Sequence, residues 1–218
     1  MMSKEVIFLK SQYSFYIMAT KISDTKSITG ASESSDTTEK PSTSKKSTDK
    51  DGKESSKLYQ FFVSALKDIY FAEDVIIEAL DKMQEAATTE ELKEAFEDHQ
   101  LQTKRHLSRV EKVFRLLDET PEKKECEAIK GMIKECEEII KSTDDGSMTR
   151  DAALIIAAQK VEHYEIATYG GLVQLALTMG HDTAANLLEQ TLQEEEDTDY
   201  NLTEIAENYI NFDAEQED

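Results

Sequence analysis

The chain has 218 residues, of which 39% are hydrophobic and 33% are charged, and its formal net charge is −21. Residues 1–56 contain nine of the 25 Lys and Arg and eight of the 46 Asp and Glu. Residues 57–218 therefore contain 16 basic and 38 acidic residues. A field of that sign disfavours nucleic acid and anionic membranes as partners and favours cations.

Residues 23–56 consist mainly of Ser, Thr, Lys, Asp and Glu, with almost no large apolar side chain. Such a segment buries too little apolar surface to fold, so residues 1–56 are predicted to form a disordered tail. The apolar runs at 6–9 and 13–18 are separated by Lys10, Ser11 and Gln12, which argues against a secretory signal. No run of about 20 apolar residues exists that would predict a membrane span.

Two cysteines, Cys126 and Cys136, lie in one predicted helical segment. Ten residues of helix separate them by roughly 15 Å, which is too far for a disulfide between them. Unbridged cysteines suit a reducing compartment, so the predicted location is cytoplasmic.

The first predicted helix spans about residues 57–87, with Ser55 or Ser56 as N-cap. Its inward stripe has a single polar member and consists of Phe62, Leu66, Ile69, Glu73, Ile76 and Leu80. Thr88-Thr89-Glu90-Glu91 fits a capping box that begins the second helix. Polar residues again occupy the middle of the second stripe, which consists of Leu92, Phe96, His99, Thr103, His106, Val110, Val113 and Leu117.

A shorter amphipathic helix over about residues 123–141 follows, and a turn at 143–147 separates it from a long helix over about 149–179. Gly180 favours the left-handed backbone that ends this helix. The last helix is capped by Asp182 and extends to about residue 209, which leaves 211–218 as an acidic tail. Four long helices with a helical crossover between the second and third predict an all-α fold, a ferritin-like antiparallel four-helix bundle over residues 57–210.

The long helix carries carboxylates on its inward face. Glu162, Glu165, Tyr169 and Leu172 fall at i, i+3, i+7 and i+10, so one stripe holds two acids in its centre. Carboxylates in an apolar interior are costly unless they are paired, hydrogen-bonded or bound to a cation.

Counting residues from the two turns predicts that the inward polar groups meet at one level. Glu73 and Gln102 lie 15 and 14 residues from the first turn at Thr88, while Glu165 and Glu195 each lie 15 residues from the second turn. At about 1.5 Å per residue, every one of these positions is roughly 22 Å from its turn. The two hairpins therefore superpose their polar groups near mid-length.

The partner of the remaining acids depends on the topology. Glu162 and Asp199 lie 18 and 19 residues from the second turn. If the crossover places the two turns at opposite ends of the bundle, these acids meet His99, whereas a simple up-down-up-down bundle brings them to His106. The crossover helix is long enough to run back along the bundle, which favours His99.

The predicted site consists of Glu73, His99, Glu162, Glu165, Glu195 and Asp199, with Gln102 at its edge. Five carboxylates and an imidazole suit two divalent metal ions, Fe or Mn, because carboxylates can bridge two metals. Five anions alone would repel one another and raise their pKa values, whereas two divalent cations leave a formal charge of about −1. By contrast, His106 and Tyr169 are interpreted as core residues and His163 as structural.

Five segments resemble the YciE/YciF family of ferritin-like bacterial proteins: YFAEDVI at 70–76, HQLQTKRHLSRVE at 99–111, CEAIKGMI at 126–133, RDAALIIAAQKVEHYEIATYGGL at 150–172 and TLQEEEDTDYNLTEIA at 191–206. The resemblance covers residues 57–210 and implies the crossover topology and a link to stress responses. It also implies a dinuclear metal centre at Glu73, His99, Glu162, Glu165, Glu195 and Asp199. The family usually has Glu at the position of Gln102, so this chain lacks one anionic ligand there.

Two functions are compatible with these observations. One is a metal-dependent redox protein whose Fe or Mn pair reacts with oxygen or peroxide. The other is a non-catalytic stress or interaction protein with a degenerate metal site, which is motivated by Gln102 and by the absence of paired Glu-x-x-His motifs. Whether the chain is an enzyme is left open. The expected partners are metal ions and a second copy in a homodimer, with no nucleic acid or membrane.

Overall fold

The computed structural model describes residues 56–217, and every regular element in that range is helical. The predicted tail over residues 1–55 and residue 218 lie outside the described residues. The elements are α3 (Lys57–Ala86), α4 (Glu90–Leu116), α5 (Glu127–Ser142), α6 (Met148–Met179), α7 (Asp182–Ile205), a π-helical segment η1 (Ala206–Ile210) and α8 (Asn211–Glu215).

The predicted helix ends are confirmed at two points. The Ser56 side chain accepts a hydrogen bond from the backbone N–H of Tyr59 and so caps α3. The start of α6 at Met148 lies one residue before the predicted position, and Ser147, which is not predicted as a cap, accepts a hydrogen bond from the N–H of Arg150 there. At the other end of α6, Gly180 has φ 80°, the left-handed conformation that glycine adopts without a Cβ penalty.

The start of α4 differs from the prediction. Thr89 is the N-cap rather than Thr88, and the predicted capping box does not form. The reason is a tertiary contact: the N–H groups of Thr88 and Thr89 donate to the two carboxylate oxygens of Asp151 on α6, at 2.6 and 2.9 Å. The Asp151 carboxylate therefore replaces the local Glu in satisfying the free donors at this helix end.

The crossover helix begins at residue 127, four residues later than predicted. Residues before it are held along α3 instead, because the N–H of Lys124 donates to the carbonyl of Lys67 and the Lys124 Nζ lies 3.1 Å from Asp68 Oδ1. Sequence periodicity carries no signal for such a contact between distant segments.

The last helix also differs in detail. His181 is the N-cap of α7 and Asp182 is its first residue. Beyond residue 210 the chain continues as α8, and Glu217 accepts hydrogen bonds from the N–H groups of Met148 and Thr149 at 2.5 and 2.9 Å. The C-terminal residues thus contact the first turn of α6.

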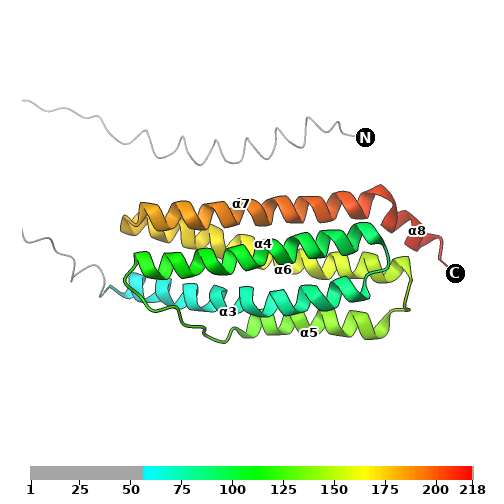
Figure 1. Cartoon of the computed structure of the whole chain (residues 1–218), viewed down its shortest axis with the longest axis horizontal. Coiled ribbons are helices and arrows are strands. Elements are labelled where there is room, and N and C mark those ends of the chain that lie inside the picture. The colour runs from blue at the N-terminus through cyan, green and yellow to red at the C-terminus, as the bar shows by residue number, and fades with distance from the viewer. Residues whose placement is uncertain (1–55, 218) are drawn as a thin grey trace, which may run out of the picture. The chain divides into compact units, whose positions relative to one another are not determined.

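The two turns lie at opposite ends of the bundle. Next to the first turn, Thr88 Oγ1 donates to the carbonyl of Ser147 just before α6. At the second turn, the His181 ring lies 6.0 Å from the Tyr59 ring at the start of α3. Between them, α5 packs against α3 and α6 and returns the chain from the end of α4 to the start of α6 (Figure 1). The predicted ferritin-like bundle with a helical crossover is confirmed.

The bundle interior is apolar toward both ends and polar in the middle. Large side chains that are fully buried include Phe62, Leu66, Phe96, Phe114, Leu154 and Leu172. Each contributes about 1.5–3 kcal/mol on burial, which anchors the four helices in register around the polar layer. Among residues 56–217, no helix has both the length and the hydropathy needed to cross a bilayer.

Candidate metal centre

Six buried ionisable side chains from four helices meet in the middle of the bundle. They are Glu73 on α3, His99 and His106 on α4, Glu162 and Glu165 on α6, and Glu195 on α7, each at most 3% exposed. They form two overlapping groups in which the potential ligand atoms lie within 4.8 Å of one another: His99 with Glu162, Glu165 and Glu195, and Glu73 with His106 and Glu195. Glu195 belongs to both groups.

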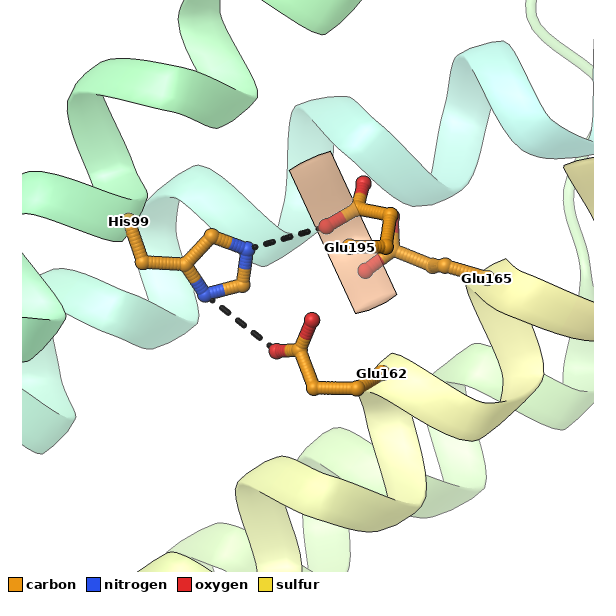
Figure 2. A group of neighbouring side chains, drawn as sticks. All are labelled: His99, Glu162, Glu165 and Glu195. Atoms are coloured by element: carbon orange, nitrogen blue, oxygen red, sulfur yellow. Dashed lines mark ion pairs between the residues drawn. The ribbon is translucent and has the colours of Figure 1, made fainter. Parts of the chain in front are cut away.

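In the first group, the His99 ring lies between carboxylates from two helices (Figure 2). His99 Nδ1 is 3.2 Å from Glu162 Oε1, and His99 Nε2 is 3.4 Å from Glu195 Oε2. Glu165 projects toward Glu195 from α6, one turn after Glu162. Four ligand side chains thus surround one point.

In the second group, His106 faces the carboxylates of α3 and α7. His106 Nδ1 is 2.9 Å from Glu195 Oε1 and 3.8 Å from Glu73 Oε2. The other oxygen of Glu73 accepts a hydrogen bond from the buried Tyr169 hydroxyl, while His106 Nε2 contacts Glu194 Oε2 at 2.7 Å. Glu73 Oε1 and His106 Nε2 are therefore held by neighbouring side chains. His106 Nδ1 remains to face Glu195, and Glu73 Oε2 remains to face His106.

Ten nitrogen and oxygen atoms of these six residues are buried and have no hydrogen-bond partner among the described residues. The contacts between imidazole and carboxylate lie within ion-pair distance but outside hydrogen-bond geometry. Leaving a buried polar atom unpaired costs about 1–3 kcal/mol, so a bound ligand that pairs with these atoms would stabilise the folded protein. Carboxylate oxygens with two imidazole nitrogens are a donor set that suits divalent Fe or Mn, and the residues fit the group.

Three of the carboxyl groups are poised to hold protons when no cation is present. Burial raises the pKa of Glu73 to about 8. Burial also raises the pKa of Glu162 and Glu165 well above the usual range, and the charge of Glu195 adds to the effect. A dication would displace these protons, because it stabilises the charged form that burial disfavours.

Glu195 has the opposite setting. Burial alone would raise its pKa, but the contacts with His106 and His99 outweigh burial and hold the pKa at about 2. For His106, burial acts to lower the pKa, but Glu195 and Glu73 overcome it and raise the value. Glu195, which belongs to both groups, is therefore ionised at neutral pH.

The structure brings together five of the seven predicted site residues, and Asp199 belongs to neither group. Gln102 accepts a hydrogen bond from Thr198, and Asp199 Oδ1 lies 3.3 Å from both Gln159 Nε2 and His163 Nδ1. Both side chains are only half-buried, unlike the six residues of the two groups. Metal ligation by these two residues stays a prediction.

His106 is the site residue that sequence reasoning missed. Counting levels pairs Glu162 with His99, a pairing that the structure contains, and so assigns His106 to the core. The signal was nevertheless present: His106 lies seven residues, or about two turns, after His99 on the same stripe. Glu195 lies between the levels of the two rings and contacts both.

A helical bundle whose four helices direct carboxylates and histidines into a common core layer defines the chain as a ferritin-like protein. Residues 57–215 match the family model described as a domain of unknown function, DUF892. Protein YciF of Escherichia coli (strain K12) is 44% identical over 155 residues, which cover 71% of this chain and 93% of YciF. The chain belongs to the YciE/YciF family.

Solved structures show the same relationship. The E. coli stress protein YciF superposes with a TM-score of 0.68 at 42% identity, over 71% of this chain and 97% of that one. YcfI from Rhodopseudomonas palustris superposes with a TM-score of 0.66 at 37% identity, over 68% and 94% of the two chains.

Proposed function

We propose that the chain is a stress-response protein that binds two divalent ions, Fe or Mn, between Glu73, His99, His106, Glu162, Glu165 and Glu195, and reacts with oxygen or peroxide. The observation that supports this most strongly is the set of ten buried nitrogen and oxygen atoms in one layer that have no hydrogen-bond partner within residues 56–217. The relative described as a stress protein supports the physiological setting.

Formal charge favours metal ions over water in this layer. Water would satisfy hydrogen bonds but would supply no positive charge, so that Glu73, Glu162 and Glu165 would have to take up protons to stay buried. Two divalent cations bring the total formal charge of the four carboxylates to zero, and two neutral imidazoles complete the donor set without adding charge.

The arrangement and burial of the ligand side chains limit which reactants the centre can take. Two ions bound by these residues would supply the electrons that reduce oxygen or peroxide. Glu195 belongs to both ligand groups and is suited to bridge them. Because no ligand side chain is more than 3% exposed, the layer is closed to organic substrates, which favours reactants as small as oxygen or peroxide.

Peroxide consumption by the metal-loaded protein tests this function. The purified protein is loaded anaerobically with Fe(II) or Mn(II), excess metal is removed, and peroxide loss is followed with time. The wild type is expected to consume peroxide, the Glu165→Gln variant is expected to be inactive, and Glu189→Gln, a matched change at an exposed position of α7, is expected to match the wild type. Equal rates in the wild type and Glu165→Gln would refute the function.

A non-catalytic protein with a degenerate site is the second candidate. The supporting observation is that Gln102 brings a neutral amide, whose oxygen accepts a hydrogen bond from Thr198. Tight metal binding with no peroxide or oxygen consumption would favour this candidate.

A cytoplasmic location and a homodimer complete the proposal. Both cysteines are free thiols, as expected in a reducing compartment. Large exposed apolar side chains, among them Phe61, Ile156, Tyr200 and Phe212, provide surface that a second copy would bury.

A further inference from the structure

His106 is held by contacts on both edges of its ring. One nitrogen, Nε2, lies 2.7 Å from Glu194 Oε2, and the other, Nδ1, faces Glu195 and Glu73. An ionised carboxylate only accepts hydrogen bonds, so Nε2 must donate its hydrogen to Glu194. The lone pair of the neutral ring is then on Nδ1, directed into the second ligand group.

Glu194 is in turn fixed by Arg109. The guanidinium donates from Nη1 to Glu194 Oε2 and from Nη2 to Oε1, both at 3.1 Å, and Nη1 also donates to Thr191 Oγ1 at 2.6 Å. Such bidentate contacts between a guanidinium and a carboxylate fix the orientation of the carboxylate. Because Glu194 and Glu195 are consecutive in α7, the same turn of that helix supplies a carboxylate to each edge of the His106 ring.

The other histidine has no comparable support. Both nitrogens of His99 face carboxylates of the first group, and neither has a hydrogen-bond partner among the described residues. Arg109 and Glu194 therefore act on one half of the centre only. This asymmetry separates their effect from a general stabilisation of the bundle.

We infer that Arg109 and Glu194 form a positioning pair that holds His106 with Nδ1 toward Glu73 and Glu195 and thereby completes the second of the two metal positions. The inference rests on the proposed function, since it concerns the same centre. Neither residue belongs to either ligand group, and both would act through the orientation of the His106 ring. Partners of this kind behind a ligand histidine typically raise metal affinity by about 10–100-fold.

Titration with Co(II), monitored by visible absorption and by metal analysis, tests the inference. In the wild type, two ions are expected to bind. In Glu194→Ala, binding of the second ion should weaken by about 10–100-fold while binding of the first stays unchanged. Glu194→Gln keeps an acceptor oxygen for the Nε2 hydrogen, so it should restore most of the affinity. Arg109→Lys, which loses the bidentate contact, should weaken the second ion only.

A matched control removes an exposed carboxylate from the same helix, and Glu189→Ala is expected to bind both ions as the wild type does. Unchanged Co(II) binding in Glu194→Ala, or equal weakening of both ions, would overturn the inference while leaving the proposed centre intact. A wild type that binds no Co(II) would overturn both. Glu194→Gln and Arg109→Lys decide the outcome if Glu194→Ala does not fold.

Discussion

Glu165 and Glu195 are neighbours in the polar layer but have opposite electrostatic settings. Neither oxygen of Glu165 has a hydrogen-bond partner among the described residues, and burial raises the pKa of this group. Glu195 lies between two imidazoles that lower its pKa. In the metal-free protein, the first carboxyl costs stability at neutral pH and the second contributes it.

Neutral substitutions at the two positions are therefore expected to act in opposite directions. In metal-free protein at neutral pH, Glu165→Gln should increase the free energy of unfolding by on the order of 1–3 kcal/mol, because the amide carries no charge that burial penalises. Glu195→Gln should decrease it by about 1.5–3 kcal/mol, because His106 loses its counter-charge. Urea denaturation in the presence of a chelator measures both, and changes of the same sign would contradict this assignment.

Asp199 is predicted as a metal ligand from the sequence, but it belongs to neither ligand group in the structure. Its side chain is 23% exposed and contacts Gln159 and His163. We expect Asp199→Asn to retain both metal ions, whereas Glu195→Gln loses them, because only Glu195 belongs to both ligand groups. Metal analysis after loading decides this, and loss of one ion in Asp199→Asn would restore Asp199 to the ligand set.

At the scale of elements, the stripes of apolar residues predicted the helices and the level at which their acids meet, because both depend on regular helix geometry. The start of α5 and the cap of α4 could not be predicted in this way. They depend on Lys124 reaching α3 and Asp151 reaching the first turn, which are contacts between distant segments. Gln102 and Asp199 lie near the level of the centre but are only half-buried, and a count of levels does not resolve the direction in which a side chain points around its helix.

The contact between α6 and the start of α4 carries its own prediction. Asp151 is fully buried and accepts hydrogen bonds from Thr88 N, Thr89 N and Thr89 Oγ1. Asp151→Ala leaves these donors unpaired and should lower the free energy of unfolding by about 2–4 kcal/mol. Asp151→Asn keeps one acceptor oxygen and should lose less. Thermal unfolding measures both variants, and a neutral effect of Asp151→Ala would show that the turn is held by other contacts.

For the whole molecule, the buried carboxyl groups set the pH dependence of stability. The folded-state pKa values of Glu73, Glu162 and Glu165 are raised, so between about pH 4.5 and about pH 8 the folded protein binds more protons than the unfolded chain. The free energy of unfolding must then fall as the pH rises through this window. The raised pKa of His106 acts in the same direction, and Glu195 acts oppositely only as the pH falls below about 4.5.

The metal-free protein is therefore expected to be more stable near pH 5 than near pH 8. Saturating Mn(II) should flatten or reverse this trend, because metal binding requires deprotonated carboxylates and strengthens as the pH rises. Denaturation curves at the two pH values, with chelator and with Mn(II), test the prediction. Glu165→Gln provides the control, since it should reduce the slope of the metal-free protein. Metal-free stability that increases from pH 5 to pH 8 would contradict the assignment of raised pKa values.

Crystals soaked with Mn(II) provide the most direct measurement of the metal centre, because anomalous scattering locates the ions without reference to activity. Two anomalous peaks are expected per chain, one among His99, Glu162, Glu165 and Glu195 and the other among Glu73, His106 and Glu195. Peaks confined to the acidic surface, with water or nothing between the buried carboxylates, would contradict the existence of the dinuclear centre.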